Sequence, residues 1–273
     1  MLISKKKKSF VIPTCILSLL LLVSIVSLTV ISCSDDKKGP GPGEISAGPG
    51  EISAGPGEIS AGPGEIVAGP GGFDFKEIKG SGNIKTREFN VSNFNKVEVS
   101  GEGVLVIEQG DVVSLDIETD DNLFEYVKVS VSGEILKIET LYGEGYDLVP
   151  TDSIYYYLKF KDLEELKLPG AVTVKCDNLQ LSKLDLDMSG VADVEVAGEI
   201  NIINISVDGV GNLKCGNLSS TDCSINGDGN AHITISVNGK LDINFTGIGT
   251  IKYSGDPEVN KNIGKLVDVE RID

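Results

Sequence analysis

The sequence is poor in the side chains that most often carry catalysis or nucleic-acid binding. Its 273 residues contain no Trp, one His and 5% aromatic residues, and 24 Lys and Arg stand against 41 Asp and Glu. A single His excludes a zinc site with two His ligands and leaves one choice of base for a Ser-His-Asp triad. The net charge of −17 argues against a nucleic-acid partner, which needs a basic surface. Composition therefore favours a β-rich exported protein and disfavours most enzyme classes.

The N-terminus reads as a secretory signal, because a lysine run (5–8) precedes an apolar stretch (10–31). The stretch ends at Val30-Ile31-Ser32-Cys33, which resembles the bacterial lipobox. The resemblance implies cleavage after Ser32 and acylation of Cys33, so residues 1–32 are interpreted as a lipoprotein signal peptide. The alternative is a transmembrane anchor, since the stretch approaches bilayer-spanning length. Either tethers the chain to membrane lipid on the exported side.

The residues directly after Cys33 bear on localisation. Ser34-Asp35-Asp36 resembles the acidic tag that sends some Gram-negative lipoproteins to the outer face, so we expect a cell-envelope protein on the outer membrane facing outward or in the periplasm.

A repeated heptapeptide follows. GPGEISA appears at positions 41, 48 and 55, followed by GPGEIVA at 62. Gly-Pro-Gly in each repeat excludes a heptad coiled coil, and such a composition cannot bury a core. Residues 33–72 are therefore predicted to be an acylated Cys and a solvated linker.

Residues 73–273 carry a repeat of about 19 residues. Five segments align on glycines at their centres, namely Gly170, Gly190, Gly209, Gly227 and Gly247. In each segment apolar residues stand two and four before the glycine and four and six after it, with polar residues between them. Alternation at period two places one set inward and the other in solvent. The pattern predicts an all-β fold, a parallel β-solenoid in which a glycine corner joins two short strands of each coil.

The same signature occurs earlier, around Gly101 and Gly80, but the register is lost between Asp111 and Leu163. We interpret that region as wider or irregular coils. The alternative is a small sheet that caps the solenoid.

At these residues the chain resembles the bacterial head GIN domain family of auto-transporter adhesins. The resemblance rests on the repeated S/D-G-x-G corners, on NVSNFNKVEVSGEGVLVIEQGD, and on GIGTIKYSGDPEV near the end. It implies a right-handed β-helix at the cell surface or in the periplasm, with adhesion proposed and no established reaction. The last turn (262–271) departs from the pattern because it lacks a closing S-G-x-G, so the sequence does not define the cap.

Three cysteines follow the linker. Disulfides are the default in an exported protein. Cys176 and Cys215, however, are predicted on one inward column two coils apart, about 9.6 Å, which is too far for a disulfide. Cys223 falls on another column. We predict three free, buried thiols.

Six acids form the candidate ligand face. Asp185, Asp222 and Asp242 are predicted in one outward column with Asn204, and Asp187, Asp193 and Glu195 lie nearby along the chain. Stacked carboxylates could bind Ca²⁺, and close acid pairs could act as acid and base on glycans. The favoured alternative is a solvated face of an acidic protein. We accordingly predict no catalytic residue, no metal and no cofactor.

His232 and a tyrosine cluster complete the set. His232 is interpreted as a surface residue. Alternation puts Tyr156 on one face and Tyr155 and Tyr157 on the other, so we expect at least one exposed tyrosine. An exposed tyrosine could stack on a sugar or anchor a protein partner, and the alternative is packing in the core.

Taken together, these patterns predict a lipid-anchored, non-enzymatic β-helix that serves adhesion or acts as a surface scaffold, with a glycan or a surface protein as its partner. The alternative is a polysaccharide-active surface enzyme that uses the outward acids.

Overall fold

The computed structural model describes residues 60–62, 65–67, 75–141 and 145–272. The chain divides into two compact units, 1–69 and 70–273. In the first unit, two short antiparallel strands lie within the glycine-rich repeats, β1 (Ser60–Gly62) and β2 (Glu65–Val67). The predicted signal peptide, Cys33 and most of the linker lie outside the described residues. Within the described part of the chain, no helix is long and apolar enough to cross a membrane.

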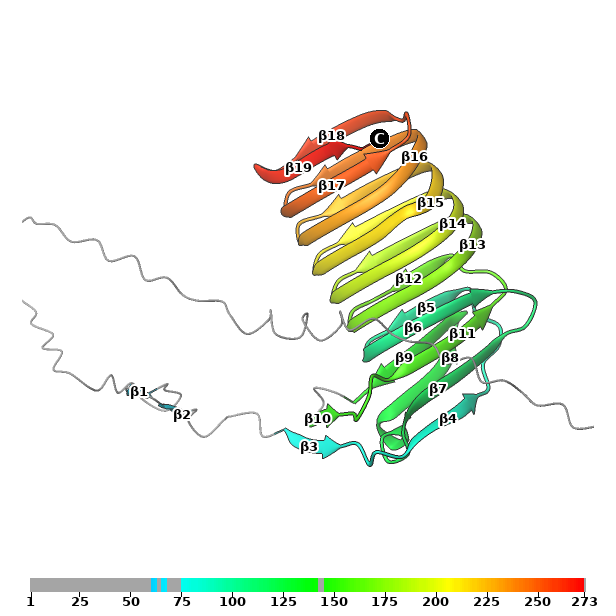
Figure 1. The fold of residues 1–273 in the computed structure, drawn as a ribbon, viewed down its shortest axis with the longest axis vertical. Coiled ribbons are helices and arrows are strands. Elements are labelled where there is room, and N and C mark those ends of the chain that lie inside the picture. Colours follow the sequence, from blue (N-terminus) through cyan, green and yellow to red (C-terminus); the bar gives the residue numbers. More distant parts are fainter. Residues whose placement is uncertain (1–59, 63–64, 68–74, 142–144, 273) are drawn as a thin grey trace, which may run out of the picture. The chain divides into compact units, whose positions relative to one another are not determined.

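The second unit is a parallel β-solenoid, as predicted. Each of four long strands runs around most of one coil and pairs in parallel with the next (Figure 1). These strands are β13 (Ala171–Met188), β14 (Val191–Val207), β15 (Val210–Gly227) and β16 (Asn230–Phe245). The last coil consists of β17 (Ile248–Ser254), β18 (Glu258–Ile263) and β19 (Leu266–Arg271). β17 and β18 both pair with β16, and β19 pairs with β17.

A column of glycines forms one corner of the solenoid. A Cβ on Gly190 would lie 2.1 Å from the carbonyl oxygen of Gly170, and one on Gly209 would lie 2.0 Å from that of Gly190. Backbone therefore packs directly on backbone, and no larger residue fits. The full column is Gly101, Gly170, Gly190, Gly209, Gly229 and Gly247.

The column corrects the predicted register of one coil. The fourth corner is Gly229, whereas the repeat alignment chose Gly227. Gly227 instead pairs with Val207 and Phe245, and it has a φ of 138°. Two glycines stand two residues apart here, and each is required by a close approach of backbone, so the local pattern could not show which one forms the corner. Gly101 is a corner as predicted. Gly80 is not a corner, because it follows β3 (Lys76–Lys79), which pairs with β10 (Tyr146–Val149) and not with a solenoid coil.

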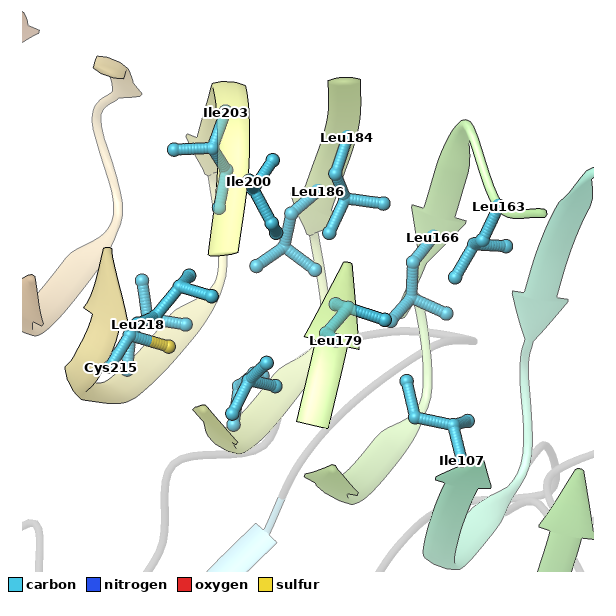
Figure 2. A pocket seen from close by; sticks show the side chains of 13 residues that line it. Ile107, Leu163, Leu166, Leu179, Leu184, Leu186, Ile200, Ile203, Cys215 and Leu218 are labelled. Carbon is cyan, nitrogen blue, oxygen red and sulfur yellow. The ribbon is translucent and has the colours of Figure 1, made fainter. Parts of the chain in front are cut away.

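Apolar columns fill the interior, as predicted except in the one coil whose register is corrected above. Met188, Val207 and Phe245 are fully buried, as are their neighbours along each strand. Burying one such side chain contributes about 1.5–3 kcal/mol. Figure 2 shows a second set of core side chains, among them Leu179, Ile200 and Leu218, and the cavity between them measures only about 10 Å³. This part of the interior is thus a packed core, and its cavity is too small for a ligand larger than water.

A mixed sheet closes the N-terminal end of the solenoid (Figure 1). β4 (Ile84–Phe89), β7 (Ser114–Asp120) and β11 (Tyr155–Phe160) pair antiparallel, and β11 then pairs in parallel with β6 (Glu102–Gln109), which leads into β13. A second path runs through a hairpin of β8 (Val127–Ser132) and β9 (Ile135–Thr140), then β5 (Lys96–Val99) and β12 (Glu165–Lys167). β3 (Lys76–Lys79) and β10 (Tyr146–Val149) form a separate parallel pair, and Phe124–Tyr126 is a 3-10 turn.

This arrangement combines the two interpretations of residues 111–163. β7 pairs antiparallel with β4 and β11, and β8 with β9, as in a capping sheet, whereas β9 and β11 also pair in parallel with β5 and β6, as the strands of irregular coils do. The hairpin turn explains the antiparallel pairing of β8 with β9. Gly133 and Glu134 both have positive φ, of 57° and 67°, as in the tight turns that join antiparallel strands. Such turns reverse the chain, whereas a solenoid coil must carry it forward.

Candidate functional site

The outward side of the solenoid has two faces, separated by the glycine corner. The first, here called face A, consists of the outward residues just before the corner, in segments 183–187, 202–206, 222–226, 240–244 and 258–262. The second, face B, consists of the outward residues just after it, in segments 191–195, 210–214, 230–234, 248–252 and 266–270. Both faces repeat the same ladder positions from coil to coil, so each presents long straight rows of side chains.

The six predicted acids do not form one group. Asp185 and Asp187 lie on face A, while Asp193 and Glu195 lie on face B, beyond the corner at Gly190. Asp222 and Asp242 also lie on face A, but in different rows. The row of Asp185 continues through Asn204, Ser224 and Asp242, whereas that of Asp222 contains Ile202 and Lys240. The predicted column of Asp185, Asp222 and Asp242 is therefore wrong, because the corner of its coil is Gly229.

Asp185 and Asp242 have the same surroundings. Asp185 contacts Lys183 at 2.8 Å and accepts a hydrogen bond of 2.7 Å from Asn204 in the next coil. Asp242 pairs in the same way with Lys240 and with Asn260 at 3.1 Å.

These contacts fix the charge state of both carboxylates. Burial acts to raise the pKa of Asp185, but the hydrogen bonds from Lys183 and Asn204 outweigh it and hold the pKa below its usual value. Hydrogen bonds from Lys240 and Asn260 lower the pKa of Asp242. A general acid needs the opposite shift, a carboxyl that keeps its proton near neutral pH. Both carboxylates therefore act as ionised, paired groups in the surface ladder.

The other acids are also paired with neighbours in adjacent coils. Asp193 contacts Lys214 at 3.2 Å, and Asp222 accepts a hydrogen bond of 3.0 Å from the backbone N–H of Lys240. Glu195 stands in a face B row between Lys175 and Lys214, so charges of opposite sign alternate along the solenoid. Asp187 differs, because its Oδ1 is buried without a hydrogen-bond partner.

The described residues contain no group of three or more His, Cys, Asp or Glu side chains that could hold a metal ion. Ca²⁺ takes six to eight oxygen ligands, usually with several carboxylates among them. The acids lie along separate rows, and Asp185, Asp193, Asp222 and Asp242 are held by lysine or amide groups, so the described residues do not provide that geometry.

A polar groove lies where the capping sheet meets the solenoid. Its volume is about 450 Å³, and charged or hydroxyl side chains line it throughout. The lining residues are Lys96, Asp162, Glu164, Glu165, Ser182, Lys183 and Asp185. Asp185 is the single member of the six predicted acids among them. Carboxylate acceptors and ammonium donors in one groove can bind a ligand rich in hydroxyl groups, such as a sugar.

The predicted thiols are confirmed. Cys176, Cys215 and Cys223 are free and buried. Burial raises the pKa of Cys215 and of Cys223 to about 12, so both stay protonated and behave as small apolar residues.

The predicted alternation of the tyrosines is also confirmed. Tyr156 is buried, and its hydroxyl donates a hydrogen bond of 2.9 Å to the carbonyl of Glu102. Tyr155 and Tyr157 lie half-buried on the outward side, with nearly parallel rings whose centroids are 6.0 Å apart. His232 is exposed on face B, in the row of Asn212 and Thr250.

The repeat alignment missed an apolar row on face B. Val191, Val210, Ile248 and Leu266 occupy the ladder position directly after the glycine corner and are 53%, 49%, 53% and 66% exposed. Asn230 fills the same position between Val210 and Ile248, and the row continues toward the cap through Ala171 and Glu102. Val191, Val210, Ile248 and Leu266 are called the apolar ridge below. The signal was present in the sequence, because Val191, Val210 and Ile248 each directly follow an aligned glycine, but the repeat alignment compared only positions farther from the glycine.

Comparisons with known proteins support the fold and the family. A family model described as "Putative auto-transporter adhesin, head GIN domain" matches residues 93–257. A crystal structure titled a putative adhesin from Bacteroides fragilis is 21% identical, with a TM-score of 0.60, and covers 71% of this chain and 100% of its own. Another, titled a putative adhesin from Parabacteroides merdae, is 18% identical, with a TM-score of 0.42, and covers 72% and 100%. No curated protein matches the chain. Because the model spans more than half of the sequence, the chain belongs to the head GIN domain adhesin family.

Proposed function

We propose that the protein is a lipid-anchored, non-enzymatic surface protein that binds a glycan or a surface protein through the outer faces of its solenoid, as an adhesin or a surface scaffold. The observation that carries this proposal is the pairing of the outward acids. Asp185, Asp193 and Asp242 each hold a lysine partner and an asparagine partner, which suits a rigid recognition surface. Membership of an adhesin family supports binding at the cell surface.

Anchoring would depend on Cys33 and the glycine-rich linker. Acyl chains on Cys33 would insert into the membrane, and multiple chains anchor stably where one does not. The repeats that follow would hold the solenoid away from the lipid. Metabolic labelling with radioactive palmitate tests this part. The full chain should incorporate label and fractionate with membranes, and Cys33→Ala should lose both, whereas a labelled Cys33→Ala protein would refute the anchor.

The polar groove is the best candidate for glycan contact. Its lysines and carboxylates converge from the capping sheet and from the first solenoid coil, so a sugar there would meet donors and acceptors together. The chain offers a matched control, because the Lys-x-Asp pair of Lys183 and Asp185 in the groove recurs as Lys240 and Asp242 three coils away.

A glycan array probed with the labelled full chain tests the groove. If a glycan binds there, Lys183→Ala with Asp185→Ala should abolish the signal, while Lys240→Ala with Asp242→Ala should leave it unchanged. Equal loss in both variants would show that the groove is not the site. Surface expression in a non-adherent bacterium, followed by counting cells attached to mucin-coated wells, tests adhesion itself. Release of reducing ends from any bound polysaccharide would favour the enzymatic alternative.

A further inference from the structure

The apolar ridge is an exposed hydrophobic row with no structural role in the described fold. Its four side chains point away from the core and occupy the same ladder position, so they form a line parallel to the solenoid axis. At about 4.8 Å per coil, the line from Val191 to Leu266 is about 19 Å long. Single exposed apolar residues are ordinary, but apolar residues aligned at one ladder position, here as two adjacent pairs on either side of Asn230, mark an interaction surface.

The glycine column leaves one side of the ridge without covering side chains. Gly190, Gly209 and Gly229 directly precede the ridge positions and carry no side chain. A partner can therefore approach the ridge from this side down to the level of the backbone. Asn230 interrupts the apolar row at its centre without any change in strand pairing, so the ladder position accommodates a polar residue.

Both sides of the ridge are acidic. Asp208 and Asp228 stand on the corner side, each next to a column glycine. Asp193 and Asp268 stand on the other side, in the face B row of Asn212, His232 and Thr250, and Asp193 already pairs with Lys214. Lys265 stands on the corner side, next to Leu266. An apolar row between acidic flanks matches a partner that has an apolar stripe between basic flanks.

We infer that the apolar ridge binds a cationic amphipathic helix. A helix that lies along the ridge presents one side chain per turn, about every 5.4 Å, which is close to the spacing of about 4.8 Å between coils. About 13 helical residues cover the distance from Val191 to Leu266. An extended strand presents same-side residues about every 6.6–6.8 Å, which does not match the spacing between coils. A second copy of this chain would bring its own acidic flanks against these.

The inference rests on the proposed function, because it names a partner class for the same binding domain. Basic amphipathic helices are found in membrane-active peptides and in docking segments of proteins. The ridge would desolvate the apolar stripe of such a helix, while Asp208 and Asp228 on one side and Asp268 on the other would meet its lysines or arginines.

A synthetic 14-residue peptide tests this. It carries leucine once per turn and lysine on both flanks, and a scrambled peptide of the same composition serves as a reference for pure charge attraction. Fluorescence anisotropy with the full chain should show at least about tenfold tighter binding of the patterned peptide. Val210→Asn with Ile248→Asn should remove that difference. Ile202→Asn with Val112→Asn, two exposed apolar residues off the ridge, should not.

Further variants and outcomes complete the test. Asp208→Asn with Asp228→Asn should weaken binding and reduce its dependence on salt. Equal binding of both peptides, or unchanged binding by the ridge variant, would overturn the inference. The inference would also be overturned if the ridge variant lost self-association in sedimentation velocity, because the partner would then be a second copy of this chain. Loss of binding to phosphatidylcholine vesicles by the ridge variant would overturn it as well, because the partner would then be a membrane. Attachment of cells that carry the ridge variant separates this inference from the proposed function. If the variant cells still attach but the variant no longer binds the peptide, the ridge is a helix site distinct from the adhesion site. If wild-type cells attach but the wild-type chain does not bind the peptide, the inference alone is overturned.

Discussion

Replacement of Asp120 by Asn should loosen the capping sheet without disturbing the solenoid. The Asp120 side chain is fully buried and accepts three hydrogen bonds, from the N–H of Gly82 at 2.7 Å and from the N–H and hydroxyl of Thr151, both at 2.8 Å. It thereby ties together the loop after β3, the end of β7 and the loop after β10. Asn has nearly the same volume, so the substitution changes charge and hydrogen bonding alone.

The expected cost follows from these contacts. Hydrogen bonds to a charged acceptor are worth about 1.5–3 kcal/mol each. Gly82 and Thr151 lie at the surface, so water can replace part of what is lost. A destabilisation of the cap by about 2–4 kcal/mol is therefore expected at neutral pH. Asp121→Asn is the control, since that neighbouring carboxylate is exposed and bonds Ser81 and Asn83 at the surface, and its effect should be smaller.

The effect should depend on pH. Burial acts to raise the pKa of Asp120, but the hydrogen bonds from Thr151 and Gly82 outweigh it and lower the pKa below its usual value. A lowered pKa in the folded state stabilises the fold above the unfolded-state pKa of about 3.9, and that contribution disappears as pH falls through the folded-state pKa. The difference between wild type and Asp120→Asn should therefore be full at pH 7 and shrink below about pH 4.

Tyrosine fluorescence during urea unfolding provides the assay. The chain has seven Tyr and no Trp, and six of the tyrosines lie between 126 and 157, so the signal reports the cap. Circular dichroism follows the solenoid separately, which matters because repeat folds need not unfold in one step. An unchanged fluorescence midpoint at pH 7, or a difference that persists undiminished at pH 3, would refute the reasoning.

Three further predictions concern the solenoid. Gly209→Ala should strongly destabilise the stack, because its Cβ would lie 2.0 Å from the carbonyl oxygen of Gly190; an unchanged melting temperature would contradict this. Phe245→Ala, at a fully buried position, should cost about 3–5 kcal/mol in urea unfolding, and the exposed Leu266→Ala should cost far less. Thiol titration of the protein carrying Cys33→Ala and Cys15→Ala should detect the three buried cysteines after denaturation and almost none before it; a single thiol would indicate a disulfide.

Alternation of apolar and polar residues was sufficient to predict the stacked coils, because each inward column must stay apolar along the whole solenoid. The same rule placed Tyr156 on the opposite face from Tyr155 and Tyr157, and together with the spacing of the coils it predicted the free thiols. It failed at Gly227 and Gly229, where both glycines are required by backbone contacts that exist only once coils are stacked. It failed again in the cap, where Gly133 and Glu134 reverse the chain. The sequence order alone did not show that Asp185 and Asp193 lie on different faces, on either side of a corner. The row that contains Val210 and Ile248, by contrast, directly follows the aligned glycines and could have been found in the sequence.

The register also shows where this fold can change length. The number of residues from the row of Lys183 to the ridge position, and from there to the row of Lys175, is the same in successive coils. The remaining stretch, between the row of Lys175 and that of Lys183, spans eight, seven, eight and six residue steps in the four long strands. All variation in coil length is therefore absorbed on the side away from the glycine corner, where the strand pairing shifts. Insertions there can diversify the protein's outline while both ladder-bearing faces keep their alignment.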